Sequence, residues 1–222
     1  MIVVLDGPAG TGKSTVSREI ASRLGLSFLD TGAMYRAMTH WLLQNGVDVD
    51  DADAVALASA KPVILSGTDA SGPTITVDGV DVSGPIRGPE VTAAVSAVSA
   101  VPEVRTRLVE LQRGSAGAAT HGIVAEGRDM GTVVFPGADL KIFLTASAPT
   151  RAVRRAAQLG VTEPTEIAAI LADIERRDAA DSGRATSPLA KADDAIEVDT
   201  SEMAPEEVIT HILGLVRSRA HV

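Results

Sequence analysis

Short apolar runs alternate along this chain with stretches whose apolar residues recur at helical spacing. The first run, residues 2–5, is β-branched and predicts a strand. Behind it Val16, Ile20 and Leu24 repeat every four residues and predict a helix. Further elements are predicted as strands at residues 27–30, 122–126, 140–145 and 195–198, and as a last helix from Pro205. Strands that alternate with helices indicate an α/β fold with a central parallel sheet flanked by helices.

Residues 62–86 have a different pattern. Two β-branched runs, 63–65 and 74–77, lie between glycines and prolines, and Asp78-Gly79 is a strong hairpin signal. We expect a small antiparallel β insertion here. The helices that we expect after it cover residues 89–100, 102–119 and 165–182.

Composition narrows the class of protein. A chain of 222 residues can bury the core of one α/β domain. Its net charge of -9 argues against a nucleic-acid surface, and the lack of cysteine excludes disulfides and thiolate metal sites. No apolar stretch approaches the roughly 20 residues that span a bilayer, and the first residues are not a signal peptide. We therefore expect a cytoplasmic protein that binds neither nucleic acid nor membrane.

A phosphate-binding loop follows the first predicted strand. The run Gly7-Pro8-Ala9-Gly10-Thr11-Gly12-Lys13-Ser14 fits the pattern G-x-x-x-x-G-K-[ST] between a strand and a helix. Its glycines let backbone N–H groups and the helix N-terminus surround an anion. Lys13 can reach the β and γ phosphates of a nucleotide, and the Ser14 hydroxyl is the expected ligand of an accompanying Mg²⁺.

Two further polar groups follow predicted strands, where the ligand crevice of a parallel sheet lies. Thr31 and Arg36 come after residues 27–30, and we expect Thr31 either to cap the next helix or to face the ligand. Arg128 and Asp129 come after residues 122–126, where they could grip a phosphate and a base, or simply pair with each other in a turn.

The predicted helix 165–182 and its C-terminal flank carry Arg177, Asp181 and Arg184 at a spacing that places all three along one stripe. Such a stripe is usually a solvated charge ladder. Nearby arginines leave positive charge that this pairing does not use, which indicates a mobile lid over a transferred phosphate. The four histidines show no metal-ligand spacing and receive no function.

Across nearly its whole length the chain resembles the bacterial cytidylate (CMP/dCMP) kinases. The resemblance rests on the phosphate loop and on the following motifs: Asp30-Thr31-Gly32-Ala33-Met34-Tyr35-Arg36, Val82-Ser83-Gly84-Pro85-Ile86-Arg87, Ser96, Val104-Arg105, the run 127–136, and the run 177–184. It implies a P-loop nucleoside monophosphate kinase that uses ATP and Mg²⁺. It also implies one domain made of a core (1–36, 120–147 and 190–222), a nucleotide-binding insertion of about 37–119 with its β part at about 62–86, and a lid of about 148–186. We expect a monomer.

The resemblance also assigns roles to residues. ATP is expected at residues 7–14 and Thr15, with Arg155 as the nearest lid residue. The acceptor phosphate is expected at Thr31, Arg36, Arg128 and Arg184, the cytosine at Ser96, Arg105 and Asp129, and the ribose at Arg177 and Asp181. Lys13, Arg128, Arg177 and Arg184 would be catalytic. Thr31 replaces the serine typical of its position but keeps the hydroxyl.

Other functions stay open at this point. A P-loop kinase of another small acceptor, UMP or a shikimate-type metabolite, would share the phosphate loop, although shikimate-type kinases generally lack the β insertion. A nucleotide-dependent regulatory module would hydrolyse ATP slowly without transfer. The carboxylate that positions Mg²⁺ is not identified, and Asp30 is a candidate through bound water.

Overall fold

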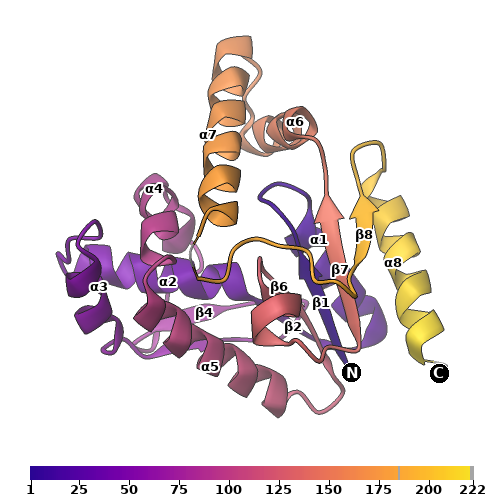
Figure 1. Ribbon diagram of the computed structural model, residues 1–222, viewed down its shortest axis with the longest axis horizontal. Helices are drawn as coiled ribbons and strands as arrows, with labels where there is room; N and C mark the ends of the chain where they lie inside the picture. Colours follow the sequence, from indigo (N-terminus) through magenta and orange to yellow (C-terminus); the bar gives the residue numbers. More distant parts are fainter. Residues whose placement is uncertain (185, 221–222) are drawn as a thin grey trace.

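A five-stranded parallel sheet forms the centre of the molecule (Figure 1) in the computed structural model, which describes residues 1–184 and 186–220. In spatial order its strands are β2 (Ser27–Asp30), β6 (Ile123–Glu126), β1 (Ile2–Asp6), β7 (Leu140–Thr145) and β8 (Ile196–Asp199). The register sets Glu126 beside both Asp30 and Leu5, so that the carboxyl ends of three strands meet at one edge. This confirms the predicted α/β class.

Helices cover both faces of this sheet because alternate residues of each strand point to opposite sides. Val3 and Leu5 pack in one core cluster with residues of α1 (Lys13–Leu24) and α8 (Pro205–Ala220). Val4 packs in the other cluster with residues of α2 (Thr31–Gln44) and α5 (Pro102–Ala118). The predicted starts of α1 and α8 agree with the structure, whereas the predicted strand bounds at 122 and 195 each lie one residue early.

The β insertion is confirmed as a three-stranded antiparallel sheet of β3 (Ile64–Ser66), β4 (Ile75–Val77) and β5 (Val80–Asp81). Asp78 starts the β4–β5 turn with a φ of 52°. Its carboxylate accepts hydrogen bonds from Val63 N at 2.8 Å and from Trp41 Nε1 at 2.9 Å, which ties the turn to α2. The helix α4 (Pro89–Val98) follows, and α3 (Ala52–Ser59), which the sequence did not predict, precedes the sheet.

Two helices, α6 (Ala148–Leu159) and α7 (Pro164–Ser182), pack against each other and stand away from the sheet (Figure 1). The lower end of α7 reaches α4 of the insertion. Because α7 ends at Ser182, Arg184 lies beyond the helix, and the expected single stripe of three charged residues is wrong in that respect. The lid range 148–186 and the range 190–222 include residues 185, 221 and 222, which lie outside the described residues. Within the described part, no helix has the length and apolar character needed to cross a membrane.

Candidate active site

The phosphate loop connects β1 to α1 as the sequence predicted. Gly12 is the N-cap of α1 with a φ of 91°, a conformation that residues with a side chain rarely adopt. At Gly7 an added Cβ would lie 2.1 Å from the carbonyl oxygen of Leu144, so only glycine lets the loop run so close to β7. The loop thus leads directly into the N-terminus of α1. The free N–H groups and the positive end of the helix dipole there favour a bound anion.

Lys13 is buried inside this loop. Its Nζ donates a hydrogen bond to Pro8 O at 2.7 Å, so the ammonium group lies within the curve of the loop. Burial, and next the positive charge of Arg128, lowers the pKa of Lys13. A phosphate that bound here would relieve the unfavourable burial of this charge. Ser14 and Thr15, the next residues of α1, are exposed.

Buried carboxylates lie at the strand ends below the loop. Glu126 is 4% exposed, and its Oε1 has no hydrogen-bond partner among residues 1–184 and 186–220. Burial, and then the nearby carboxylate of Asp30, raises the pKa of Glu126, while the Ser14 hydroxyl lowers it. A hydroxyl, an orphaned carboxylate oxygen and a second carboxylate are the hard oxygen donors that Mg²⁺ binds directly or through water. These residues therefore fit the metal that nucleotide chemistry requires.

Asp6 plays a different part at the same edge. Its carboxylate accepts hydrogen bonds from Met130 N at 2.9 Å and Gly131 N at 2.8 Å, and so fixes the π-helix Met130–Val134. Burial raises the pKa of Asp6 to about 6. Asp6 thus positions the segment that follows Arg128 and Asp129.

Thr31 and Arg36 begin α2 at the end of β2. The expectation that Thr31 caps this helix is wrong, because Asp30 is the N-cap and accepts from Ala33 N at 2.9 Å. Thr31 instead donates its hydroxyl to Glu126 O at 2.6 Å. Arg36 donates to Thr92 Oγ1 at 2.9 Å. Burial, and then Arg177, lowers the pKa of Arg36 to about 10, which reflects a concentration of positive charge around it.

Arg128 connects the phosphate loop to helix α7. Its Nη1 donates to Gly7 O at 3.0 Å, and its Nε pairs with Asp181 Oδ2 at 2.9 Å. Asp181 also pairs with Arg184 through its other oxygen. Gly127 permits this packing, since a Cβ there would lie 2.8 Å from the Thr31 hydroxyl. Two arginines thus flank one carboxylate beside the phosphate loop.

Arg105 and Asp129 form a buried ion pair deeper in the same region. Their side chains are 4% and 3% exposed, and Arg105 Nη1 also donates to Ser99 O at 3.1 Å. Ser96, on the same helix α4 as Thr92, is partly exposed. The pairing of a cation with a carboxylate is common in structural ion pairs, but its burial beside the arginines near the phosphate loop also suits recognition of a polar base edge.

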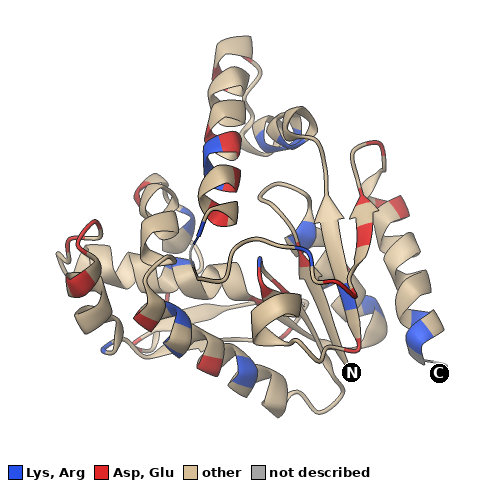
Figure 2. Cartoon of the chain, viewed as in Figure 1, with Lys and Arg blue, Asp and Glu red and all other residues tan. Residues whose placement is uncertain are grey.

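The arginines of α6 and α7 make several separate contacts. Arg177 donates to Thr92 O at 2.8 Å and pairs with Asp173 at 3.0 Å, so it bridges α7 to α4. Arg155 is exposed, and its Nη1 donates a long hydrogen bond to Gln158 Oε1 at 3.4 Å. Arg151 is the arginine of α6 that touches the phosphate loop, where its Nη1 donates to Ala9 O at 3.0 Å. Figure 2 shows the interleaved positive and negative segments on the lower half of α7.

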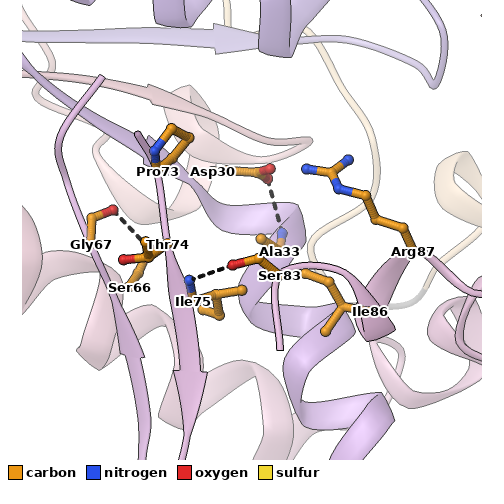
Figure 3. Close-up of a pocket in the computed structure, with 10 residues that line it drawn as sticks. All are labelled: Asp30, Ala33, Ser66, Gly67, Pro73, Thr74, Ile75, Ser83, Ile86 and Arg87. Atoms are coloured by element: carbon orange, nitrogen blue, oxygen red, sulfur yellow. Dashed lines mark hydrogen bonds between the residues drawn. The ribbon is translucent and has the colours of Figure 1, made fainter. Parts of the chain in front are cut away.

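A separate hollow lies between α2 and the small sheet (Figure 3), lined by Asp30, Thr74, Ser83 and Arg87 among others. Its volume of about 40 Å³ holds a few water molecules. It is too small for a nucleotide. The candidate active site is therefore the group formed by the phosphate loop, Arg36, Arg128 and the C-terminal part of α7.

Several residues of this site went unassigned at the sequence level. Glu126 ended a predicted strand without being given a role, and its position beside the phosphate loop was the available signal. Asp6 and Arg151 act through contacts with residues more than 120 positions away. Tyr35 stood in a family motif without a role, and no pattern in the sequence marks Gln112 as buried.

A parallel sheet with its central strand leading into this loop, a buried lysine within the loop, and arginines gathered beside it are the features of a P-loop kinase. The comparisons with known proteins give the family. A sequence profile described as "Cytidylate kinase" matches residues 3–218. The chain belongs to the cytidylate kinase family.

The relatives match over almost the full chain. The cytidylate kinase of Streptomyces griseus is 60% identical over 219 residues, which cover 99% of this chain and 94% of that protein. The cytidylate kinase of Rhodococcus opacus is 54% identical over 223 residues, covering 100% and 97%. Among solved structures, an uncharacterized protein of Eubacterium ventriosum matches with a TM-score of 0.50 at 13% identity and 98% coverage of both chains, which shows a shared fold.

Proposed function

We propose that this protein transfers the γ phosphate of ATP to CMP or dCMP, giving ADP and CDP or dCDP. The observation that carries the proposal is Arg128, which contacts the phosphate loop at Gly7 O and pairs with Asp181 of the lid helix. It stands between a donor site and an acceptor site, as transfer between two phosphates requires. Family membership and the relatives named cytidylate kinase support this choice over UMP, a shikimate-type acceptor or a regulatory role.

ATP would bind with its phosphates in the loop. Residues 7–15 would surround the β and γ phosphates, and Lys13 would neutralise the charge that develops on the transferred group. Arg155, exposed on α6, would reach ATP when the lid closes, while Arg151 already supports the loop at Ala9.

The acceptor phosphate would bind opposite the loop, at Thr31, Arg36, Arg128 and Arg184. In the structure Asp181 pairs with both Arg128 and Arg184 and neutralises part of their charge. A phosphate dianion would take over part of that neutralisation, which leaves an Asp181 oxygen for a ribose hydroxyl beside Arg177. This exchange would make lid ordering depend on the acceptor.

The base would be read at Asp129, Arg105 and Ser96. Cytosine presents an exocyclic amine next to two acceptors, N3 and O2. Asp129 would accept from the amine, and Arg105 and the Ser96 hydroxyl would donate to the acceptors. Uracil would place a carbonyl oxygen against the carboxylate, so the same pair of charges rejects it.

The chemistry needs no general base from the protein, because the attacking phosphate oxygen is largely ionised near neutral pH. The protein aligns that oxygen in line with the γ phosphate, and Lys13, Arg128, Arg177 and Arg184 neutralise the charge. Lid closure by residues 148–186 over the insertion 37–119 excludes water from the γ phosphate.

The family implies a divalent metal with ATP, and we propose Mg²⁺. Ser14 would bind it directly, and Glu126 and Asp30 would hold it through water. Bound there, the metal would supply positive charge that offsets the charge of the phosphates. We also propose that the protein acts as a monomer in the cytoplasm, without nucleic-acid or membrane partners.

The test is a substrate panel. ADP release is measured with CMP, dCMP, UMP, AMP and shikimate, and without any acceptor. We expect CMP and dCMP to give the highest kcat/KM. Faster turnover of UMP or AMP would show that the base assignment is wrong, and ADP release that ignores the acceptor would support a regulatory ATPase instead.

A further inference from the structure

The face of α5 that points toward α2 contains polar groups that stability does not explain. Gln112 is fully buried at 0% exposure, and neither its Nε2 nor its Oε1 has a hydrogen-bond partner within the described ranges. The hydroxyl of Tyr35, on α2, is also buried and unpaired within the same part of the chain. Each buried group left unpaired costs about 1–3 kcal/mol, so methionine and phenylalanine would serve the core better.

Tyr35 lies next to the buried ion pair of the site, and Gln112 lies behind Tyr35. Arg105 precedes Gln112 by seven residues, two turns of α5, and therefore shares its face. The guanidinium carbon of Arg105 lies 5.4 Å from the centre of the Tyr35 ring, a distance at which a cation is attracted to the ring face. The Tyr35 hydroxyl lies at the side chain of Gln112, and burial raises the pKa of Tyr35 to about 12, so the hydroxyl stays protonated.

The contacts therefore run from Gln112 through Tyr35 to Arg105 and on to Asp129. Arg105 has five N–H donors, of which Nη1 bonds Ser99 O and Nη2 bonds Asp129. Its Nε is buried and has no partner in the residues that the structure describes. The direction in which the remaining donors point depends on the tilt of the ring beneath the guanidinium.

We infer that Gln112 and Tyr35 are positioning residues that hold Arg105 in the orientation that reads the cytosine edge. The inference rests on the proposed function. The Gln112 side chain lies against the Tyr35 hydroxyl and limits the tilt of the ring, and the ring supports the guanidinium. Arg105 then keeps Asp129 turned toward the exocyclic amine of a cytosine nucleotide, so that the buried amide acts on base choice without touching the base.

The experiment uses Gln112→Met, Tyr35→Phe and the double variant, each close in shape to the original. We measure kcat and KM for CMP, UMP and ATP, together with the melting temperature. Each single variant should raise the KM for CMP about tenfold and lower the CMP/UMP ratio of kcat/KM similarly, since small misplacements at a reacting complex have effects of this size. The KM for ATP should stay constant and the melting temperature should stay or rise.

The double variant separates positioning from independent packing. If the two residues act through one chain of contacts, the double variant loses no more selectivity than either single variant. Ile212→Val is the control, because Ile212 is fully buried on α8 in the other core cluster, so its truncation lowers stability away from Gln112, Tyr35 and Arg105. It should lower the melting temperature and leave the CMP/UMP ratio unchanged.

The outcomes distinguish the inference from the function. If wild-type protein prefers CMP and Gln112→Met and Tyr35→Phe keep that preference, the inference is wrong and the function stands. Selectivity losses that simply add in the double variant also overturn it. A wild-type protein without preference for CMP overturns the proposed function itself. If Gln112→Met does not fold, Tyr35→Phe, which removes a single oxygen, decides the question.

Discussion

Replacing Asp129 tests both the stability and the selectivity that the buried ion pair provides. In Asp129→Ala, Arg105 keeps its charge at 4% exposure without its carboxylate partner. Breaking a buried pair from one side costs about 3–5 kcal/mol, because the remaining charge is desolvated and uncompensated. For a protein of this size, each kcal/mol lowers the melting temperature by about 2–4 °C. The alanine variant should therefore melt roughly 6–20 °C lower.

Asp129→Asn separates the two effects. Asparagine keeps one oxygen for Arg105, so its loss of stability should be smaller. Its amide nitrogen would face the exocyclic amine of cytosine, donor against donor, at a cost of about 1–3 kcal/mol, or about 5- to 150-fold in kcat/KM for CMP. The same nitrogen would donate to the O4 of uracil. The CMP/UMP ratio should fall by at least about tenfold.

The assays are thermal unfolding by circular dichroism and ADP release with CMP and with UMP. Glu197→Gln is the control, since Glu197 and its partner Lys191 are 49% and 44% exposed, and such surface pairs contribute about 0–1 kcal/mol. An alanine variant that melts like the control would refute the stability argument. An asparagine variant with the original CMP/UMP ratio would refute the placement of Asp129 at the base.

Three further predictions concern other parts of the molecule. Lys13→Met should lower kcat by at least about 10³-fold in an ADP-release assay. The melting temperature should stay or rise, because a buried charge is removed. Turnover near the original rate would contradict the role of Lys13 in phosphate transfer. Folding raises the pKa of Asp6 from 3.8 to about 6. Between these two pH values the folded state holds more protons than the unfolded state. The free energy of unfolding therefore falls as pH increases through this window. In urea titrations from pH 3.5 to 7, Asp6→Asn should lack roughly 3 kcal/mol of this fall, and an unchanged slope would exclude Asp6 as its source. Asp78→Ala should lower the free energy of unfolding in urea by about 1–3 kcal/mol, since Val63 N and Trp41 Nε1 lose their acceptor, and it should shift the fluorescence of Trp41. Asp78→Asn should lose less stability, because asparagine keeps an acceptor oxygen and tolerates positive φ. Equal losses of stability in the two variants would contradict this account.

Short-range patterns in the sequence determined the α/β class, the phosphate loop and the β insertion. A run of β-branched residues, an apolar residue every fourth position and an Asp-Gly turn each act within a few residues, so one sequence suffices to find them. The helix Ala52–Ser59 escaped because its alanine-rich sequence has little polar contrast. The π-helix Met130–Val134 escaped because its amides are held by Asp6, which is 124 residues away at Met130.

Only the tertiary structure decided how the charged residues are paired and which polar groups are buried. The sequence places arginines and carboxylates near the strand ends, but it does not say that Asp181 lies between Arg128 and Arg184, or that Asp30 rather than Thr31 caps α2. Such pairings depend on the register of parallel strands and on the packing of α7 over the core. The buried oxygen of Glu126 and the buried amide of Gln112 depend on the same packing, because desolvation is a property of everything that surrounds a group and not of its neighbours in the chain.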